Sequence, residues 1–283
     1  MKINQKTQGI LYIIGAAFFF ALMNLFVRLA GEVPTFQKCF FRNIVAAFAA
    51  VIMLRKKGVE FQVGKGNLKY LLIRSTAGLM GIICNFYAVD HLAISDASLL
   101  NKLSPFFAII FSAIILKEMA GAREWGILAL AFVGALFVIK PSMGMEFLPG
   151  LIGMLGGACA GLAYTYVRKL GQRGVNGMVI VAFFSAFSSI LLLPNLLLNY
   201  MPMTPYQWVV LLLAGVAATG GQVCITTAYT KAPAKEISVF DYSQIIFAAI
   251  LGLVVLDQIP DVYSIIGYVI ILAAAVIKWN FRD

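Results

Sequence analysis

The chain is poor in acidic residues, histidine and cysteine. Aspartate and glutamate together contribute 12 of its 283 residues, and His91 is the only histidine. The four cysteines stand singly in hydrophobic segments without CxxC spacing, which predicts neither a metal site nor a disulfide framework. A single histidine leaves almost no basis for a Ser–His or His-dyad active site. GxxxxGK[ST], HExxH and GxSxG motifs are also missing from the sequence. We therefore predict that the protein is not an enzyme and carries no cofactor.

Apolar side chains are abundant. Hydrophobic residues make up 61% of the sequence and charged residues 12%, with a mean hydropathy of +0.92. A soluble domain carries about 45–50% apolar and about 25% charged residues. Apolar runs of roughly 18–22 residues recur, and this length matches about 30 Å of hydrocarbon at 1.5 Å per helical residue. We predict an all-α membrane protein with ten transmembrane helices, at approximately 8–30, 35–54, 68–90, 94–116, 123–140, 148–168, 177–198, 206–230, 235–256 and 262–280.

Basic residues between these spans predict the orientation. With the N-terminus inside, 16 lysines and arginines fall in inside loops, and only Lys140 falls in an outside loop. Cytoplasmic loops are enriched in lysine and arginine, so both termini are expected in the cytoplasm and the protein in the cell membrane, multi-pass. The net charge of +10 follows from this bias, and we do not predict nucleic acid as a partner.

A first pair of segments suggests a duplication. Residues 9–31 and 150–171 both begin with glycine, and both contain an aromatic-Val-Arg sequence near their ends, which supplies Arg28 and Arg168. The two segments lie about 140 residues apart.

A second pair occurs in the same order. Residues 86–118 and 228–258 each contain a tyrosine near the end of one span, a short turn, and a second span that ends near an acid, Glu118 or Asp257. Because five spans per repeat is an odd number, the second half must enter the membrane from the opposite face. We predict a 5+5 inverted repeat, an architecture of many secondary transporters, with the substrate site near the midplane between the halves.

The stretch FYAVDHLAISDASLLNKLSPFF…LKE, within 86–118, resembles the EamA-type repeat of the drug/metabolite transporter superfamily. Together with the duplication, the span number and the length, this resemblance covers essentially the whole chain. It implies two EamA repeats, residues 1–145 and 146–283, around a central cavity lined by spans one to four and six to nine. It also implies transport of small organic metabolites by alternating access, often as efflux.

Two features depart from the family pattern. Asp257-Gln258 stands where a Gly-Glu is usual at the end of the ninth span, and Gln244 stands where the first repeat has Pro105. We therefore expect the proline kink only in the first half.

The fourth span contains a charge and a helix breaker. Lys102 lies about nine residues into the span, roughly 13 Å deep, where a lipid-facing ammonium would cost several kcal/mol. Pro105 frees a carbonyl near Asn101, and freed backbone groups at this depth require protein or a wet cavity around them. Lys102 and Asn101 are thus candidate substrate-binding residues. The alternative is a structural kink in which Lys102 pairs with a neighbouring helix.

Asp241 is the acid of the ninth span, and the repeat alignment places it opposite Lys102. A salt bridge between them that opens when substrate or a proton binds would form a gate. A permanent bridge, or a capping role for Asp241 at the cytoplasmic end of the span, is the alternative.

Further basic and aromatic residues lie within the spans. Arg42 is four residues from Lys38 on one face of the second span and is the deeper of the two. Arg74 lies inside the third span, where it either lines the site or snorkels to the cytoplasm. The excess of basic over acidic residues favours an anionic or zwitterionic substrate, whose carboxylate an arginine binds bidentately. The candidate residues that stack on or hydrogen-bond a ligand are Tyr87, Tyr229 and Tyr242.

Three functions fit this pattern. The first is a secondary active transporter of a small polar metabolite, an amino acid or organic anion, with proton coupling as an option. The second is a lipid or polyprenyl-phosphate flippase with a lateral opening near Arg42 and Arg74. The third is a channel or a non-transporting scaffold. The expected partners are the substrate, the lipid bilayer and, as an option, a second copy in a homodimer.

Overall fold

The computed structural model describes residues 4–91, 100–140, 146–257 and 259–281. Within these ranges the regular structure is helical and contains no strand. Eight of the described helices are long and apolar enough to cross a membrane. In chain order the elements are α1 (Gln5–Leu29), α2 (Thr35–Lys56), α3 (Leu68–His91), α5 (Ser104–Leu116), α6 (Ala122–Ile139), α7 (Phe147–Gln172), α8 (Gly177–Leu198), α9 (Pro205–Lys231), α10 (Ala234–Ile237), η1 (Ser238–Tyr242), α11 (Ser243–Leu256) and α12 (Val262–Asn280).

The predicted all-α class is confirmed for the described residues, and most helix ends lie within a few residues of the predicted spans. Local sequence explains several starts. At α9, the Thr204 hydroxyl accepts from the Gln207 amide while the Gln207 side chain accepts from the Thr204 amide, a capping box that fixes the first turn. Pro205 occupies the first helical position, where its missing N–H costs nothing. Part of the predicted fourth span, residues 92–99, lies outside the described residues.

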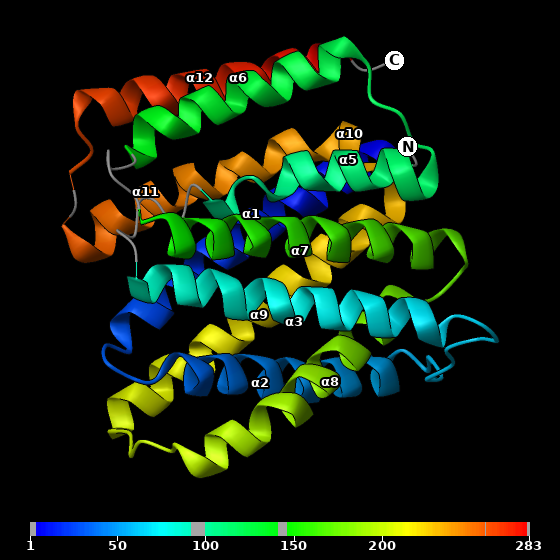
Figure 1. The fold of residues 1–283 in the computed structure, drawn as a ribbon, viewed down its shortest axis with the longest axis vertical. Helices are drawn as coiled ribbons and strands as arrows, with labels where there is room; N and C mark the ends of the chain where they lie inside the picture. Colours follow the sequence, from blue (N-terminus) through cyan, green and yellow to red (C-terminus); the bar gives the residue numbers. More distant parts are fainter. Residues whose placement is uncertain (1–3, 92–99, 141–145, 258, 282–283) are drawn as a thin grey trace.

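The helices form a bundle with two outer pairs and a central group. In Figure 1, α6 and α12 lie together at one edge, and α2 and α8 lie at the opposite edge. Between them α1 packs along α9, and α3 packs along α7. The first turn of α1 and the last turn of α12 lie at the same end of the bundle (Figure 1).

Each of the long helices in the first half has an equivalent in the second half, and equivalent helices make equivalent contacts. The α1–α9 contact has its counterpart in α3–α7, and the α5–α7 contact has its counterpart in α1–α11. The pairs α6–α12 and α2–α8 each join equivalent helices of the two halves. Such equivalence is the contact pattern that a two-fold relation between the halves produces.

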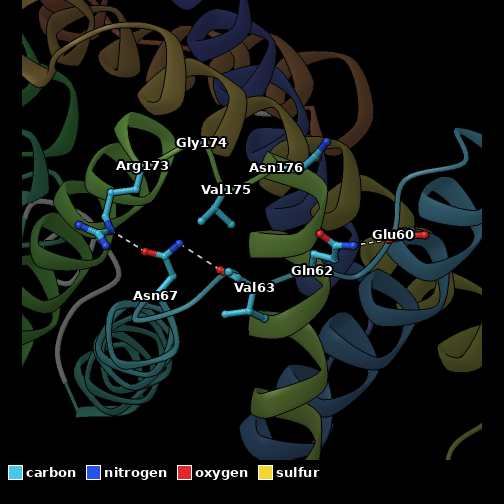
Figure 2. A pocket seen from close by; sticks show the side chains of 9 residues that line it. Glu60, Gln62, Val63, Asn67, Arg173, Gly174, Val175 and Asn176 are labelled. Carbon is cyan, nitrogen blue, oxygen red and sulfur yellow. Dashed lines mark hydrogen bonds between the residues drawn. The ribbon is translucent and has the colours of Figure 1, made fainter.

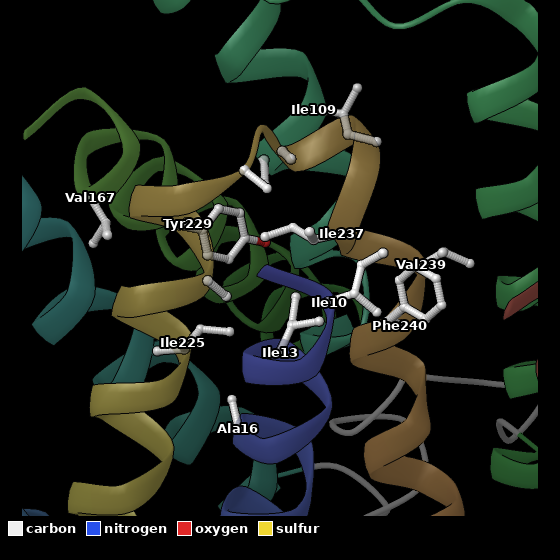
Figure 3. Packing of buried hydrophobic residues seen from close by; sticks show 14 of the residues in the cluster. Ile10, Ile13, Ala16, Ile109, Val167, Ile225, Tyr229, Ile237, Val239 and Phe240 are labelled. Carbon is white, nitrogen blue, oxygen red and sulfur yellow. The ribbon is translucent and has the colours of Figure 1, made fainter. Parts of the chain in front are cut away.

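Much of the apolar core lies where α1 meets α9 and the α10–η1 segment. Ile10 and Ile13 of α1 are at most 1% exposed and lie against Ile225, Tyr229 and Ile237 (Figure 3). This packing fixes η1, which carries Asp241, against the first helix of the other half.

Two glycines set the closest helix crossing. A Cβ on Gly267 would lie 2.5 Å from the carbonyl oxygen of Gly134, and a Cβ on Gly134 would lie 2.9 Å from that of Gly267. The α6 and α12 backbones therefore touch directly, a packing mode in which small residues substitute for the hydrophobic effect inside a bilayer.

We expect Gly267→Ala to destabilise the protein, because its methyl group has no space and overpacking costs about 1–3 kcal/mol. Thermal unfolding of the detergent-purified protein measures the effect. Gly126→Ala is the matched control, since nothing lies within 4 Å of its Cβ position on α6, the helix that Gly267 contacts. Equal melting temperatures for the two variants would contradict the direct backbone contact between α6 and α12.

Both central spans are interrupted, one in each half. Residues 102–103 form a turn before α5, and Pro105 lies in the first turn of α5. In the second half the short α10 passes through the 3₁₀ turn η1 into α11. The proline at the interruption is thus found only in the first half, but the second half is interrupted as well. A proline is not needed, because the 3₁₀ hydrogen-bonding pattern supplies the irregularity at η1.

The ends of the interrupted spans also correspond. Lys117 ends α5 and Asp257 ends α11, both in the left-handed conformation, with φ of 59° and 52°. Non-glycine residues adopt this conformation infrequently, so its occurrence at matching positions indicates a shared local design.

Candidate functional site

Lys102 and Asp241 meet where the two interruptions face each other. The Nζ atom of Lys102 lies 3.1 Å from Oδ2 of Asp241 and donates to Oε1 of Gln244 at 2.7 Å. The Lys102 and Asp241 side chains are 8% and 13% exposed. The salt bridge predicted from the repeat alignment is thus present. Asp241 therefore does not act solely as a helix cap.

Helix lengths locate this pair within the bundle. α5 has 13 residues and α11 has 14, so each carries the chain about 20 Å from the pair to a bundle end. The two helices run in opposite directions (Figure 1). A pair that lies about 20 Å from each of two opposite ends is near the middle of a bilayer, which is about 40–45 Å thick with its headgroup regions.

Tyrosines surround the pair. The Tyr242 hydroxyl donates to the carbonyl oxygen of Lys102 at 2.8 Å, which satisfies a carbonyl at the interruption. Tyr229 is 2% exposed, and its hydroxyl lies 3.4 Å from Oγ of Ser238 in η1. Its ring stacks on that of Tyr164, with centroids 4.9 Å apart. We call Lys102, Asp241, Gln244 and Tyr242 the central polar cluster.

Arg74 does not snorkel. Its side chain is 2% exposed, its guanidinium carbon lies 3.7 Å from the centre of the Phe184 ring, and Nη1 lies near Gly78, one turn further into the bundle. Arg42 and Arg74 are close enough to interact electrostatically with each other and with Tyr164. We call Arg42 and Arg74 the arginine pair.

In the described part of the chain, Tyr87 and Asn101 form no hydrogen bond, ion pair or ring contact with these groups. The Tyr87 ring stacks on His91 of its own helix at 4.0 Å, and the Tyr87 carbonyl lies 2.9 Å from Nδ1 of His91. Asn101 is partly exposed at the end of a helical turn before the interruption. Their assignment to a substrate site remains a prediction.

Sequence reasoning missed two contributors. Gln244 stood out only as a departure from proline, yet its amide oxygen accepts from Lys102. Phe184 carried no signal among 22 phenylalanines, and its cation–π contact with Arg74 arises only when α3 and α8 pack together.

One end of the bundle is closed by polar links between the halves. The guanidinium of Arg168 on α7 binds Oε1 of Glu118 through Nε at 3.0 Å and Nη2 at 2.9 Å, and Nη1 donates to the carbonyl oxygen of Thr230 at 3.2 Å. Glu236 lies 3.0 Å from Lys6 and 3.2 Å from Lys278. These contacts tie both halves together at the end where α1 begins.

The opposite end has fewer such links. Arg28 and Asp257, the repeat counterparts of Arg168 and Glu118, are both exposed and form no ion pair among the described residues. Lys140 and Asp261 do pair there, joining α6 to the start of α12. Hydrogen bonds from Lys140 and from the Ser264 amide lower the pKa of the Asp261 carboxyl to about 2, so this pair stays charged at physiological pH.

A surface cleft of about 450 Å³ lies between the α2–α3 connection and the α7–α8 turn. Figure 2 shows Asn67 between its two partners: it accepts from Arg173 and donates to the Val63 carbonyl at 3.0 Å. None of the predicted site residues lines this cleft. The described residues contain no group of three or more His, Cys, Asp or Glu side chains that could hold a metal ion.

Comparison with known proteins gives a consistent result. The model of the EamA-like transporter family matches residues 7–140 and again 148–278. The pseudopaline exporter CntI of Pseudomonas aeruginosa is 30% identical over 279 residues, which covers 98% of this chain and 97% of the exporter. Human solute carrier family 35 member G1 is 23% identical, covering 96% of this chain and 80% of its own length. A protein of known crystal structure, 15% identical, superposes with a TM-score of 0.85 over 95% of this chain and 96% of the other.

Proposed function

Because the chain belongs to the EamA-like transporter family, we propose that it is a secondary active transporter that moves a small polar organic metabolite across the cytoplasmic membrane by alternating access. The observation that carries this proposal is the buried Lys102–Asp241 bridge, which joins the two halves near the middle of the layer. Charged residues at this depth are costly and are characteristic of substrate and ion pathways.

The proposed architecture is a 5+5 inverted repeat with units at residues 1–145 and 146–283 and both termini in the cytoplasm. Support comes from the exchange of helix contacts between halves and from the two family matches. The distribution of basic residues supports the orientation. On this orientation the Arg168–Glu118 end is cytoplasmic and closed, and the end with Arg28 and Asp257 faces outward.

Proton coupling would act through the central polar cluster. Asp241 faces Lys102 and Gln244, and it interacts electrostatically with Tyr164, Tyr229 and Tyr242. A proton on the Asp241 carboxylate would neutralise one side of the bridge and weaken the link between the halves, since Lys102 would keep only Gln244 and the Asp241 carbonyl oxygen as acceptors. Protonation and substrate binding would then bias the same two-state element.

A lipid flippase is less well supported. That function requires a lateral opening near Arg42 and Arg74, but Phe184 covers the Arg74 guanidinium and the residue is 2% exposed.

We expect counterflow in proteoliposomes: a trapped pool of unlabelled amino acids and organic acids should accelerate uptake of a labelled member of the pool. An inside-acid or outside-acid pH gradient should change the rate in the wild type, and Asp241→Asn should remove that dependence. A channel would show no acceleration by the trapped pool, which would overturn the transporter proposal. A wild-type rate that is unaffected by either gradient would overturn the proton coupling alone.

A further inference from the structure

The polar atoms that lack a partner gather in one part of the bundle. Nine buried side-chain nitrogen or oxygen atoms of the described residues have no hydrogen-bond partner, and six of them belong to α2, α3 and α8. These three helices pack against one another. The six atoms are Arg42 Nε, Arg74 Nε and Nη1, and the hydroxyl oxygens of Ser75, Ser185 and Ser188. Buried polar groups are normally satisfied, so such a concentration requires an explanation.

The unsatisfied atoms of this group can all donate hydrogen bonds. Guanidinium nitrogens only donate hydrogen bonds, and serine hydroxyls can donate. The groups with which Arg42 and Arg74 interact electrostatically are Cys39, Tyr164 and each other, and none of them is a carboxylate. The two cations therefore repel each other. Arg74 has the Phe184 ring on one face, but neither arginine forms a salt bridge with a carboxylate of the described residues to offset its burial.

The balance of charge around the site supports the same reading. Lys102 and Asp241 neutralise each other. Among the described side chains of α2, α3 and α8, the arginine pair then leaves a charge of +2 at this place. A ligand with two negative charges would cancel it, and each arginine can bind one carboxylate bidentately from its own helix.

We propose that Arg42 and Arg74 together bind a substrate with two acidic groups, a small dicarboxylate, where α2, α3 and α8 pack together. This inference rests on the proposed transport function and narrows its substrate class. A monocarboxylate would leave one cation unpaired, and a zwitterion would add a positive charge to the site. A phosphate monoester, free or on a lipid, offers a similar charge but only one anionic centre.

The test is ligand-induced thermal stabilisation of the full-length protein in detergent. Succinate and glutarate are compared with butyrate, glutamine, inorganic phosphate and polyprenyl phosphate. We expect dicarboxylates to raise the melting temperature more than any other probe. Arg42→Gln and Arg74→Gln should each weaken the apparent affinity for the dicarboxylate at least about tenfold, since hydrogen bonds to charged groups are strong. Arg55→Gln, at the exposed end of α2, is the control and should bind like the wild type.

A second readout separates binding from packing. Without ligand, Arg74→Gln should melt at a higher temperature than the wild type, because it removes a buried cation that has no acidic partner. A purely structural Arg74 would give the opposite result and overturn the proposal. Equal or greater stabilisation by butyrate, glutamine, phosphate or polyprenyl phosphate would also overturn it. If one of these other probes shows counterflow, the dicarboxylate proposal fails but the transport function stands. If no probe shows counterflow, the transport function itself is contradicted.

Discussion

Replacing Asp241 by alanine is expected to lower the free energy of unfolding by about 3–5 kcal/mol and to abolish transport. The Lys102 ammonium would keep Gln244 and a carbonyl oxygen as acceptors but would lose its only acidic partner among the described residues. A buried charge without a counter-charge costs several kcal/mol in a protein interior. Chemical or thermal unfolding of the purified protein measures the first effect, and uptake into proteoliposomes measures the second.

The double variant Lys102→Met/Asp241→Leu separates the two effects. Apolar residues of similar volume often replace a buried ion pair without loss of stability, so this variant should be close to wild type in unfolding but remain inactive. Glu32→Ala, which removes an exposed acid, should change stability by less than about 0.5 kcal/mol. An active double variant would mean that the bridge is only structural.

Reversing the charge at Glu118 is expected to reduce transport to less than about a tenth of the wild-type rate. Glu118→Arg would place two guanidinium groups at the end that the Arg168–Glu118 pair closes, where both wild-type side chains are 16% exposed. Breaking a partly buried pair costs enough to shift a two-state equilibrium tenfold or more, since about 1.4 kcal/mol is a factor of ten. Uptake assays in both directions measure the loss.

The charge swap Glu118→Arg/Arg168→Glu restores an opposite-charge pair and should recover a large part of the activity. At the other end, Arg28→Cys/Asp257→Cys tests the proposed alternate state, because the proposed inverted repeat should pair these positions when the Arg168–Glu118 end opens. A thiol cross-linker should join them faster in a Glu118→Arg background. An unchanged cross-linking rate would contradict the idea that the Arg28–Asp257 end closes when the Arg168–Glu118 end opens.

The positions of the spans could be predicted well because the rise of a helix per residue sets how many apolar residues are needed to cross the bilayer. The Lys102–Asp241 bridge could be predicted because the two residues lie 139 positions apart, at the repeat offset. A repeat alignment places residues in space once the symmetry is assumed, without any knowledge of side-chain packing.

What the sequence could not predict depends on tertiary contact. Nothing in SVFDYSQ marks a 3₁₀ turn, since the segment contains neither proline nor glycine. Arg74 lies close enough to the span end to snorkel, and only the packing of α8 against α3 turns it inward over Phe184. The sequence marks Arg168 only as part of the repeated aromatic-Val-Arg motif and as one of the basic residues between spans, because its partner Glu118 comes from the other half of the chain.

The glycine crossing of α6 and α12 bears on how motion in the protein can be measured. Because Gly134 and Gly267 bring the two backbones into direct contact, neither helix can slide along the other without a steric clash. In the alternating access that we propose, we therefore expect α6 and α12 to move as one unit. Probes attached to the two helices would keep a constant separation and give spectroscopic distance measurements an internal standard.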